Sequence, residues 1–174
     1  FIVETKNEYT IQLEGILAPL IYEGFESIYL ETKKVIKKGD ENKLLKTFQQ
    51  FIRKIPSWNE NMINTETQRI ITQSRCDWLS DLLKAVIKSN ILLLSNSNQN
   101  ISKKFKINEE HLNIPINKFI HKCYIESARQ IYSIPDLFYH INSPINRKRN
   151  QRESLDIIKN SIKEAIRKML PVQY

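Results

Sequence analysis

Apolar residues recur every three or four positions through nearly the whole chain, and no stretch alternates apolar and polar residues between turn signals. The first spacing places apolar side chains on one face of an α-helix, whereas a half-buried β-strand needs the second. We therefore expect an all-α fold. The sequence contains no internal repeat, no heptad pattern long enough for a coiled coil and no low-complexity tract. Residues 1–174 are accordingly expected to form a single compact bundle of about six or seven helices.

The composition indicates a folded core. The chain has 174 residues, 41% of them hydrophobic, and seven Tyr, seven Phe and two Trp supply the bulk that helices can pack around. Apolar runs such as Ile91–Leu94 are far short of the roughly 20 residues that cross a bilayer, so no transmembrane segment is expected. The first residue is Phe1 rather than Met, which suggests the ordered part of a longer chain.

The first predicted helix extends from about Asn7 to Ile36. Pro19 lies inside it, and a proline removes one backbone hydrogen bond and crowds the preceding turn. We therefore expect this helix to be kinked or broken near Pro19.

Helix boundaries follow from capping patterns and prolines. A second helix is expected to end at Pro56. Ser57 with Glu60, and Ser74 with Asp77, have the spacing of a capping box, in which the first side chain accepts from a backbone N–H of the first turn. These pairs predict the starts of the third and fourth helices.

Two further helices are expected at about 116–133 and 151–170. The stretch 96–115 is polar and weakly patterned, and a short strand pair around 101–107 is an alternative there. The most amphipathic segments predict one shared core. Its expected members are Trp78, Leu82, Leu83, Val86, Phe119, Cys123, Leu155, Ile158 and Ile162.

The chain lacks the patterns that specify a reaction. His121 and Cys123 are two residues apart and would lie on opposite sides of a helix, so they cannot easily share a metal ion. Asp77 and Asp81 lie one turn apart, but acids in a first turn also complement the helix dipole. No phosphate loop, dinucleotide fingerprint, zinc-protease motif or nucleophile elbow occurs. We expect no enzyme activity, no metal and no cofactor, and we expect Cys76 and Cys123 to be reduced core thiols.

Charge is distributed unevenly along the chain. Residues 1–36 contain three Lys and six Glu, a net charge of −3, whereas residues 140–174 contain eight Lys or Arg and three acids, a net charge of +5. The whole chain has a formal charge of +8 and a pI near 9.4. These values permit nucleic-acid binding, and the basic end suggests an anionic partner or a contact with the acidic first helix of the same or another subunit.

The strongest local signal is a cluster of four cations: Arg147, Lys148, Arg149 and Arg152. They stand before and at the start of the last predicted helix, where the helix dipole disfavours positive charge. Three interpretations are open: a nucleic-acid contact, a docking patch for an acidic protein surface, or a solvated helix start. We favour docking and predict these four residues as partner-binding.

The nucleic-acid alternative has its own sequence criterion. No aromatic residue is interleaved with the cluster, although single-strand binders stack bases on aromatic rings. One continuous basic face joining the cluster to Arg53, Lys54, Lys103 and Lys104 would favour nucleic acid. A scattered distribution favours protein docking.

Five segments of the chain are distinctive: NEYTIQLEGILAPLIYEGFESIY (7–29), FQQFIRKIPSWN (48–59), ETQRIITQSRCDWLSDLLKAV (66–86), FIHKCYIESARQIYSIPDLFYH (119–140) and NRKRNQRESLDIIKNSIKEAIRKMLP (146–171). Their most specific pieces are Pro19 with Tyr22-Glu23-Gly24, Pro56 with Trp58-Asn59, Cys76-Asp77-Trp78-Leu79 and the final basic helix. Together these segments resemble an uncharacterised helical protein family of the nucleocytoplasmic large DNA viruses, or giant viruses.

The resemblance implies a viral protein and brings no catalytic residue with it. By analogy of type with small helical minor capsid proteins, we expect a structural or interaction protein of the virion that docks onto other viral structural proteins. Its expected location is the virion, and the host cytoplasm during assembly. The alternative is a basic helical nucleic-acid-binding factor of viral replication or transcription.

Overall fold

The computed structural model describes residues 1–97 and 112–170. This part of the chain contains six α-helices, three 3-10 turns and no strand, which confirms the all-α prediction. The alternative strand pair at 101–107 lies outside the described residues. The helices are α1 (Ile2–Val35), α2 (Leu44–Arg53), α3 (Glu60–Ser74), α4 (Leu79–Ser97), α7 (Ile116–Ser133) and α8 (Pro144–Met169), and the turns are η1 (Glu41–Lys43), η2 (Ile55–Ser57) and η3 (Pro135–Phe138).

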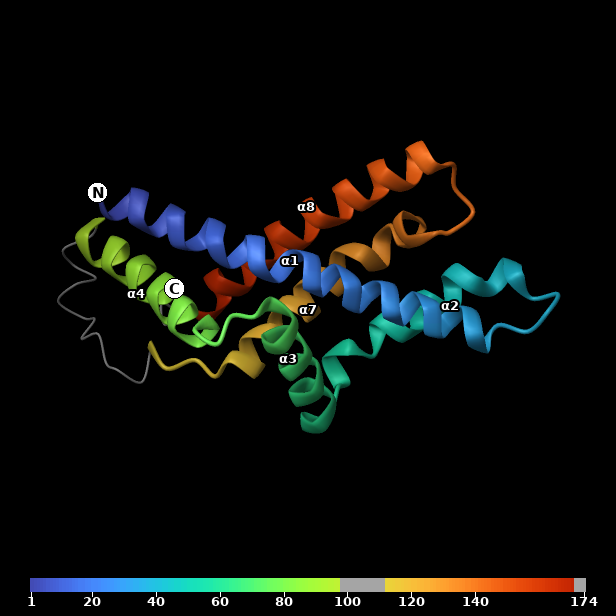
Figure 1. Ribbon diagram of the computed structural model, residues 1–174, viewed down its shortest axis with the longest axis horizontal. Helices are drawn as coiled ribbons and strands as arrows, with labels where there is room; N and C mark the ends of the chain where they lie inside the picture. The colour runs from blue at the N-terminus through green and yellow to red at the C-terminus, as the bar shows by residue number, and fades with distance from the viewer. Residues whose placement is uncertain (98–111, 171–174) are drawn as a thin grey trace.

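The long helix α1 is the spine of the bundle (Figure 1). It packs against α4, α8, α2 and α3. Helix α7 lies against α8 and α3, while η3 packs against the first part of α8. Helices from both ends of the sequence therefore meet in the middle of the molecule.

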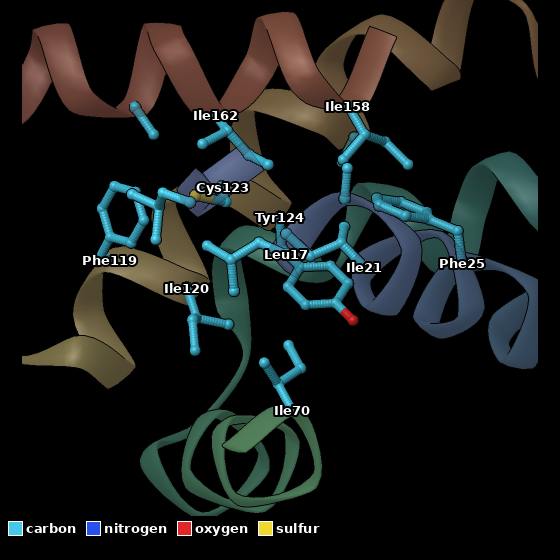
Figure 2. Packing of buried hydrophobic residues seen from close by; sticks show 14 of the residues in the cluster. Leu17, Ile21, Phe25, Ile70, Phe119, Ile120, Cys123, Tyr124, Ile158 and Ile162 are labelled. Atoms are coloured by element: carbon cyan, nitrogen blue, oxygen red, sulfur yellow. The ribbon is translucent and has the colours of Figure 1, made fainter. Parts of the chain in front are cut away.

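Apolar side chains from these helices form a hydrophobic cluster (Figure 2). Phe25 of α1 and Tyr124 of α7 have ring centroids 5.4 Å apart. Of the nine predicted core residues, seven are buried and Leu155 is partly buried against the cluster. Most of the residues that the helical spacing assigned to the core therefore lie in the interior.

Trp78 is the error in that core prediction, because its side chain is 47% exposed. Helix α4 begins one residue later, at Leu79, so Trp78 lies in the preceding turn rather than on the apolar stripe. The predicted cap at Ser74 is also wrong. Ser74 is the last residue of α3, and its Oγ accepts from the backbone N–H of Cys76 at 3.2 Å.

Helix α1 is continuous through Pro19. The predicted break is therefore absent, and the predicted kink is not confirmed. Leu17, Ala18 and Ile21 are fully buried around the proline. Their burial offsets the one backbone hydrogen bond that Pro19 cannot make.

Two other helix starts differ from the predictions. Asn59, not Ser57, caps α3, since its Oδ1 accepts from the N–H of Met62 at 2.8 Å. Helix α8 begins at Pro144 rather than near Gln151. None of the helices in the described part of the chain has the length and apolar character needed to span a membrane.

Candidate functional site

The early start of α8 places the whole basic cluster inside a helix. Ser143 is the N-cap, and its Oγ accepts from the N–H of Asn146 at 3.2 Å. Pro144 follows at the first helical position, where its missing N–H costs nothing because that group has no partner in a helix. The Ser-Pro pair therefore begins the helix three residues before Arg147.

The first turns of α8 extend beyond the core. No residue from 145 to 153 is buried, and the first buried residue of the helix is Ser154. This part of α8 lies at the edge of the molecule (Figure 1). Its side chains are consequently available to a partner.

Arg147 has a different role from the other three cations. Its guanidinium donates two hydrogen bonds to the backbone carbonyl of His140, one of them from Nε at 3.1 Å. This contact ties the start of α8 to the loop that precedes it. Arg147 thereby stabilises the site, although its positive charge is not neutralised by a carbonyl.

Lys148, Arg149 and Arg152 form no ion pair and no side-chain hydrogen bond with residues in the described ranges. They follow Ile145 by three, four and seven residues, which puts all four side chains on one side of the helix. The side chain of Ile145 is 80% exposed. We call these four residues the outer face of α8.

The acidic first helix does contact α8, but at the other half of α8. Lys163 lies 3.7 Å from the carboxylate of Glu14 on α1. Burial raises the pKa of Glu14, and the charges of Lys163 and Lys159 act in the opposite direction. The opposite charges of the chain ends thus meet within the protein without involving the outer face.

A second buried carboxylate holds α8 against α7. Glu126 is 5% exposed and lies 2.8 Å from Nζ of Lys168, 3.2 Å from Arg129 and 3.5 Å from Lys122. Burial works to raise its pKa, but the hydrogen bond from Lys168 and the neighbouring positive charges outweigh it and lower the pKa. Cations in this half of α8 therefore have structural partners.

Beside the outer face lies a hollow of about 340 Å³ between α1, η3 and α8. We call it the aromatic groove. Its described lining comes from α1 (Tyr22, Glu26, Tyr29, Leu30, Lys33), from η3 and the following loop (Leu137, Phe138, Tyr139, His140) and from α8 (Arg147, Gln151).

Tyr29 and His140 form the polar floor of this groove. The Tyr29 hydroxyl oxygen accepts the backbone N–H of His140 at 3.1 Å and lies 2.6 Å from its Nδ1. In a neutral ring whose Nε2 carries the proton, Nδ1 accepts the hydrogen bond from the Tyr29 hydroxyl. Burial and the charges of Lys33 and Arg147 lower the pKa of His140, which favours this neutral ring.

Glu26 is the acid of the groove. Burial and the charge of Glu23 raise its pKa. Burial and the charge of Glu26 in turn raise the pKa of Tyr22 to about 12. Tyr22 therefore keeps its proton at neutral pH and can donate it.

Other polar residues serve the core. The Tyr124 hydroxyl donates to Glu66 at 2.5 Å, Glu66 pairs with Arg69, and Arg69 donates to the carbonyl of Leu20 at 2.6 Å. A Cβ at Gly24 would lie 1.8 Å from the Tyr124 hydroxyl oxygen, so only glycine allows α1 and α7 to approach this closely. This network connects α1, α3 and α7.

The residues considered for metal binding have structural contacts. His121 Nε2 lies 2.8 Å from the carbonyl oxygen of Ile55, and its ring stacks on Trp58. Cys76 and Cys123 are buried free thiols, and burial raises the pKa of both. Within residues 1–97 and 112–170, no three His, Cys, Asp or Glu side chains gather as a metal site would require.

Residues 1–139 match the model of DUF5764, a family of unknown function. The chain belongs to this family. The match ends at Tyr139, immediately before the loop that leads into α8. No curated protein and no solved structure matches the chain.

In this DUF5764 member, two parts of the site escaped prediction for different reasons. Ile145 had a usable signal, since Ser143 and Pro144 form an N-cap and first-turn pair that begins a helix at that point. The aromatic groove had none. Tyr29 and His140 are 111 residues apart, and no local pattern indicates that they meet.

Proposed function

We propose that this protein docks onto an acidic surface of another protein through the outer face of α8. The observation that carries the proposal is Ile145, 80% exposed on the same side of the helix as Lys148, Arg149 and Arg152. An apolar anchor surrounded by cations matches the apolar centre and charged rim of a protein interface.

The combination favours protein over nucleic acid. A phosphate backbone attracts Lys and Arg but gives an exposed aliphatic side chain no surface to be buried against. A protein partner can bury it, and full burial of an Ile side chain contributes about 1.5–3 kcal/mol. Carboxylates of the same partner would then form ion pairs with the three cations of the outer face.

The biological setting is proposed from the resemblance to the giant-virus family. In that setting the protein is a virion-associated or minor capsid protein, its partners are other viral structural proteins, and it occupies the host cytoplasm during assembly. The absence of enzyme activity stays a prediction.

A nucleic-acid-binding factor is the second candidate. The observation in its favour is the aromatic groove, which brings Tyr22 and Tyr139 beside Arg147 and so supplies the aromatic rings that the linear sequence lacks near the cluster. The criterion of a continuous basic face applies only in part, because Lys103 and Lys104 lie outside the described residues. Arg53 lines a different hollow, between α2 and α7.

The test reverses the outer-face charges and leaves Arg147 intact. We expect the K148E/R149E/R152E variant to be lost from particles of the source virus, with recruitment measured by quantitative mass spectrometry of purified virions. The matched control is K37E/K38E/K46E, which makes the same charge change at three exposed lysines elsewhere. The control should be packaged like the wild type.

Duplex DNA provides the opposing measurement. We expect weak binding that fades steeply between about 50 and 200 mM salt, because counterion release supplies it. Tight, sequence-dependent DNA binding at physiological salt, lost in K148E/R149E/R152E alone, would replace docking with the second candidate.

A further inference from the structure

The aromatic groove has walls suited to a flat apolar group. The ring of Tyr22 stacks on Phe138 with centroids 5.4 Å apart and an interplanar angle of 26°. Tyr139 is half-buried beside them, and Leu30, 53% exposed, stands in the wall formed by α1. The volume of about 340 Å³ is at the small end of ligand pockets. Such a space fits one ring better than a large ligand.

The charges of the groove favour an anion next to that ring. Lys33 and Arg147 line it, and Glu26 is the one acid of its described lining. Arg147 is hydrogen-bonded to a neutral carbonyl, so its positive charge is not compensated. A ligand that combines a ring with a negative charge therefore complements the groove.

The groove is continuous with the outer face of α8. Arg147 and Gln151 line the groove, and Lys148 of the outer face lies three residues before Gln151, so these two side chains are neighbours on the helix surface. One partner segment crossing α8 can consequently contact both. The groove and the outer face then act as two parts of one docking surface.

We infer that the groove binds an aromatic side chain flanked by carboxylates, contributed by an acidic segment of the docking partner. The inference rests on the proposed function and specifies the chemistry of the partner. A nucleotide also combines a ring with an anion, but the exposed aliphatic side chains around the site favour a protein. Leu30, Ile141 and Ile145 are 53%, 64% and 80% exposed, and a protein can bury them.

The experiment compares two blocked peptides, Asp-Glu-Trp-Glu-Asp and Asp-Glu-Ala-Glu-Asp, by calorimetry and by NMR of the tyrosine ring signals. We expect the tryptophan peptide to bind about tenfold more tightly or better, as truncation of an anchor residue predicts. Shifts should concentrate on Tyr22 and Tyr139. Equal affinity of the two peptides would overturn the inference.

Leu30→Glu provides the groove variant, and Ile11→Glu is its matched control. Both add one carboxylate to α1 at an exposed aliphatic position, 53% and 62% exposed, but only Leu30 lines the groove. We expect Leu30→Glu to remove the preference for tryptophan and Ile11→Glu to keep it. A preference that survives Leu30→Glu would place the anchor elsewhere.

Two further results separate this inference from the proposed function. The outer-face variant K148E/R149E/R152E should weaken both peptides by a similar factor, so the ratio of their affinities tests the groove alone. If that ratio is one while virion recruitment still depends on the outer face, only the groove inference fails. A short oligo-dT strand and unlabelled tryptophan peptide can each be tested as competitors of the bound tryptophan peptide. If oligo-dT displaces it at the lower concentration, the groove is assigned to nucleic acid.

Discussion

The two halves of α8 belong to one helix and have opposite surroundings. The C-terminal half buries Ile158, Ile162 and Ile166 in the core, and Lys163 and Lys168 pair with acids of α1 and α7. The N-terminal half, from 145 to 153, buries nothing. The difference shows that neighbouring helices, not helix formation itself, decide whether a basic amphipathic segment becomes core or remains available for binding.

The largest expected effect is a difference in protein stability between substitutions in the two halves of α8. Ile162→Ala in the buried half is expected to lower the free energy of unfolding by about 2–5 kcal/mol, because it removes packed methylene groups and leaves a cavity. Ile145→Ala in the exposed half should change it by less than about 0.5 kcal/mol. Urea denaturation of both variants checks this. Equal losses would contradict the contrast between the halves.

The next effect concerns the buried acids that pair with the C-terminal half. The folded-state pKa of Glu126 is lowered, so its ionised form adds stability that is fully present above the unfolded pKa and is lost as pH falls through the folded pKa. Glu126→Gln should therefore cost about 1.5–3 kcal/mol at neutral pH. The cost should shrink in acid, as urea denaturation across the pH range would show.

Glu14→Gln is the matched control for that experiment. The pKa of Glu14 is raised in the folded state, so folding disfavours its charged form, and that penalty is present above the folded pKa. Its Oε1 has no hydrogen-bond donor. The substitution should leave stability at neutral pH unchanged or increase it. A loss as large as that of Glu126→Gln would refute the assigned directions.

A smaller effect should come from the cap that starts the exposed half. Ser143→Ala is expected to cost about 1 kcal/mol, since the side chain no longer accepts from the first turn. Hydrogen exchange should accelerate at residues 145–153 and stay slow beyond Ser154. Asn59→Ala removes the cap of α3 in the same way, and it should accelerate exchange in α3 alone. Uniform acceleration across α8 in Ser143→Ala would mean that the two halves unfold together.

The smallest expected change in stability is that of K148E/R149E/R152E. These cations have no partner among the described residues, so thermal unfolding should reveal a shift of less than about 0.5 kcal/mol. The same reversal in the other half, K163E/R167E/K168E, breaks ion pairs to Glu14, Glu164 and Glu126 and should destabilise the protein clearly. Comparable losses in both variants would show that the outer face has a structural role.

The all-α class and most of the named core positions were predicted correctly because helical periodicity is a local property. Leu82, Phe119 and Ile158 were placed correctly from spacing alone. Trp78 was misplaced because α4 begins at Leu79, one residue later than the apolar spacing indicated. That boundary depends on how the chain leaves α3. Pro19 was expected to kink or break α1, but the helix is continuous through it, with buried residues on both sides.

The candidate site was predictable only as a cluster of charges. Spacing identified Arg147, Lys148, Arg149 and Arg152, but it could not distinguish the one that ties down a loop from the three that point outward. That distinction depends on the position of the His140 carbonyl. The aromatic groove depends likewise on residues more than one hundred positions apart, such as Tyr29 and His140.

By itself, the sequence determined that this chain forms helices and that its last helix is strongly basic, because both properties depend on residues within a few positions of each other. Only the tertiary structure decided which cations are neutralised. Lys163 lies against Glu14 and Lys168 against Glu126 because α1 and α7 pack beside them, whereas no helix covers the outer face of α8 in the described structure. Ion pairs form over a few ångströms, and packing alone determines which charges come that close.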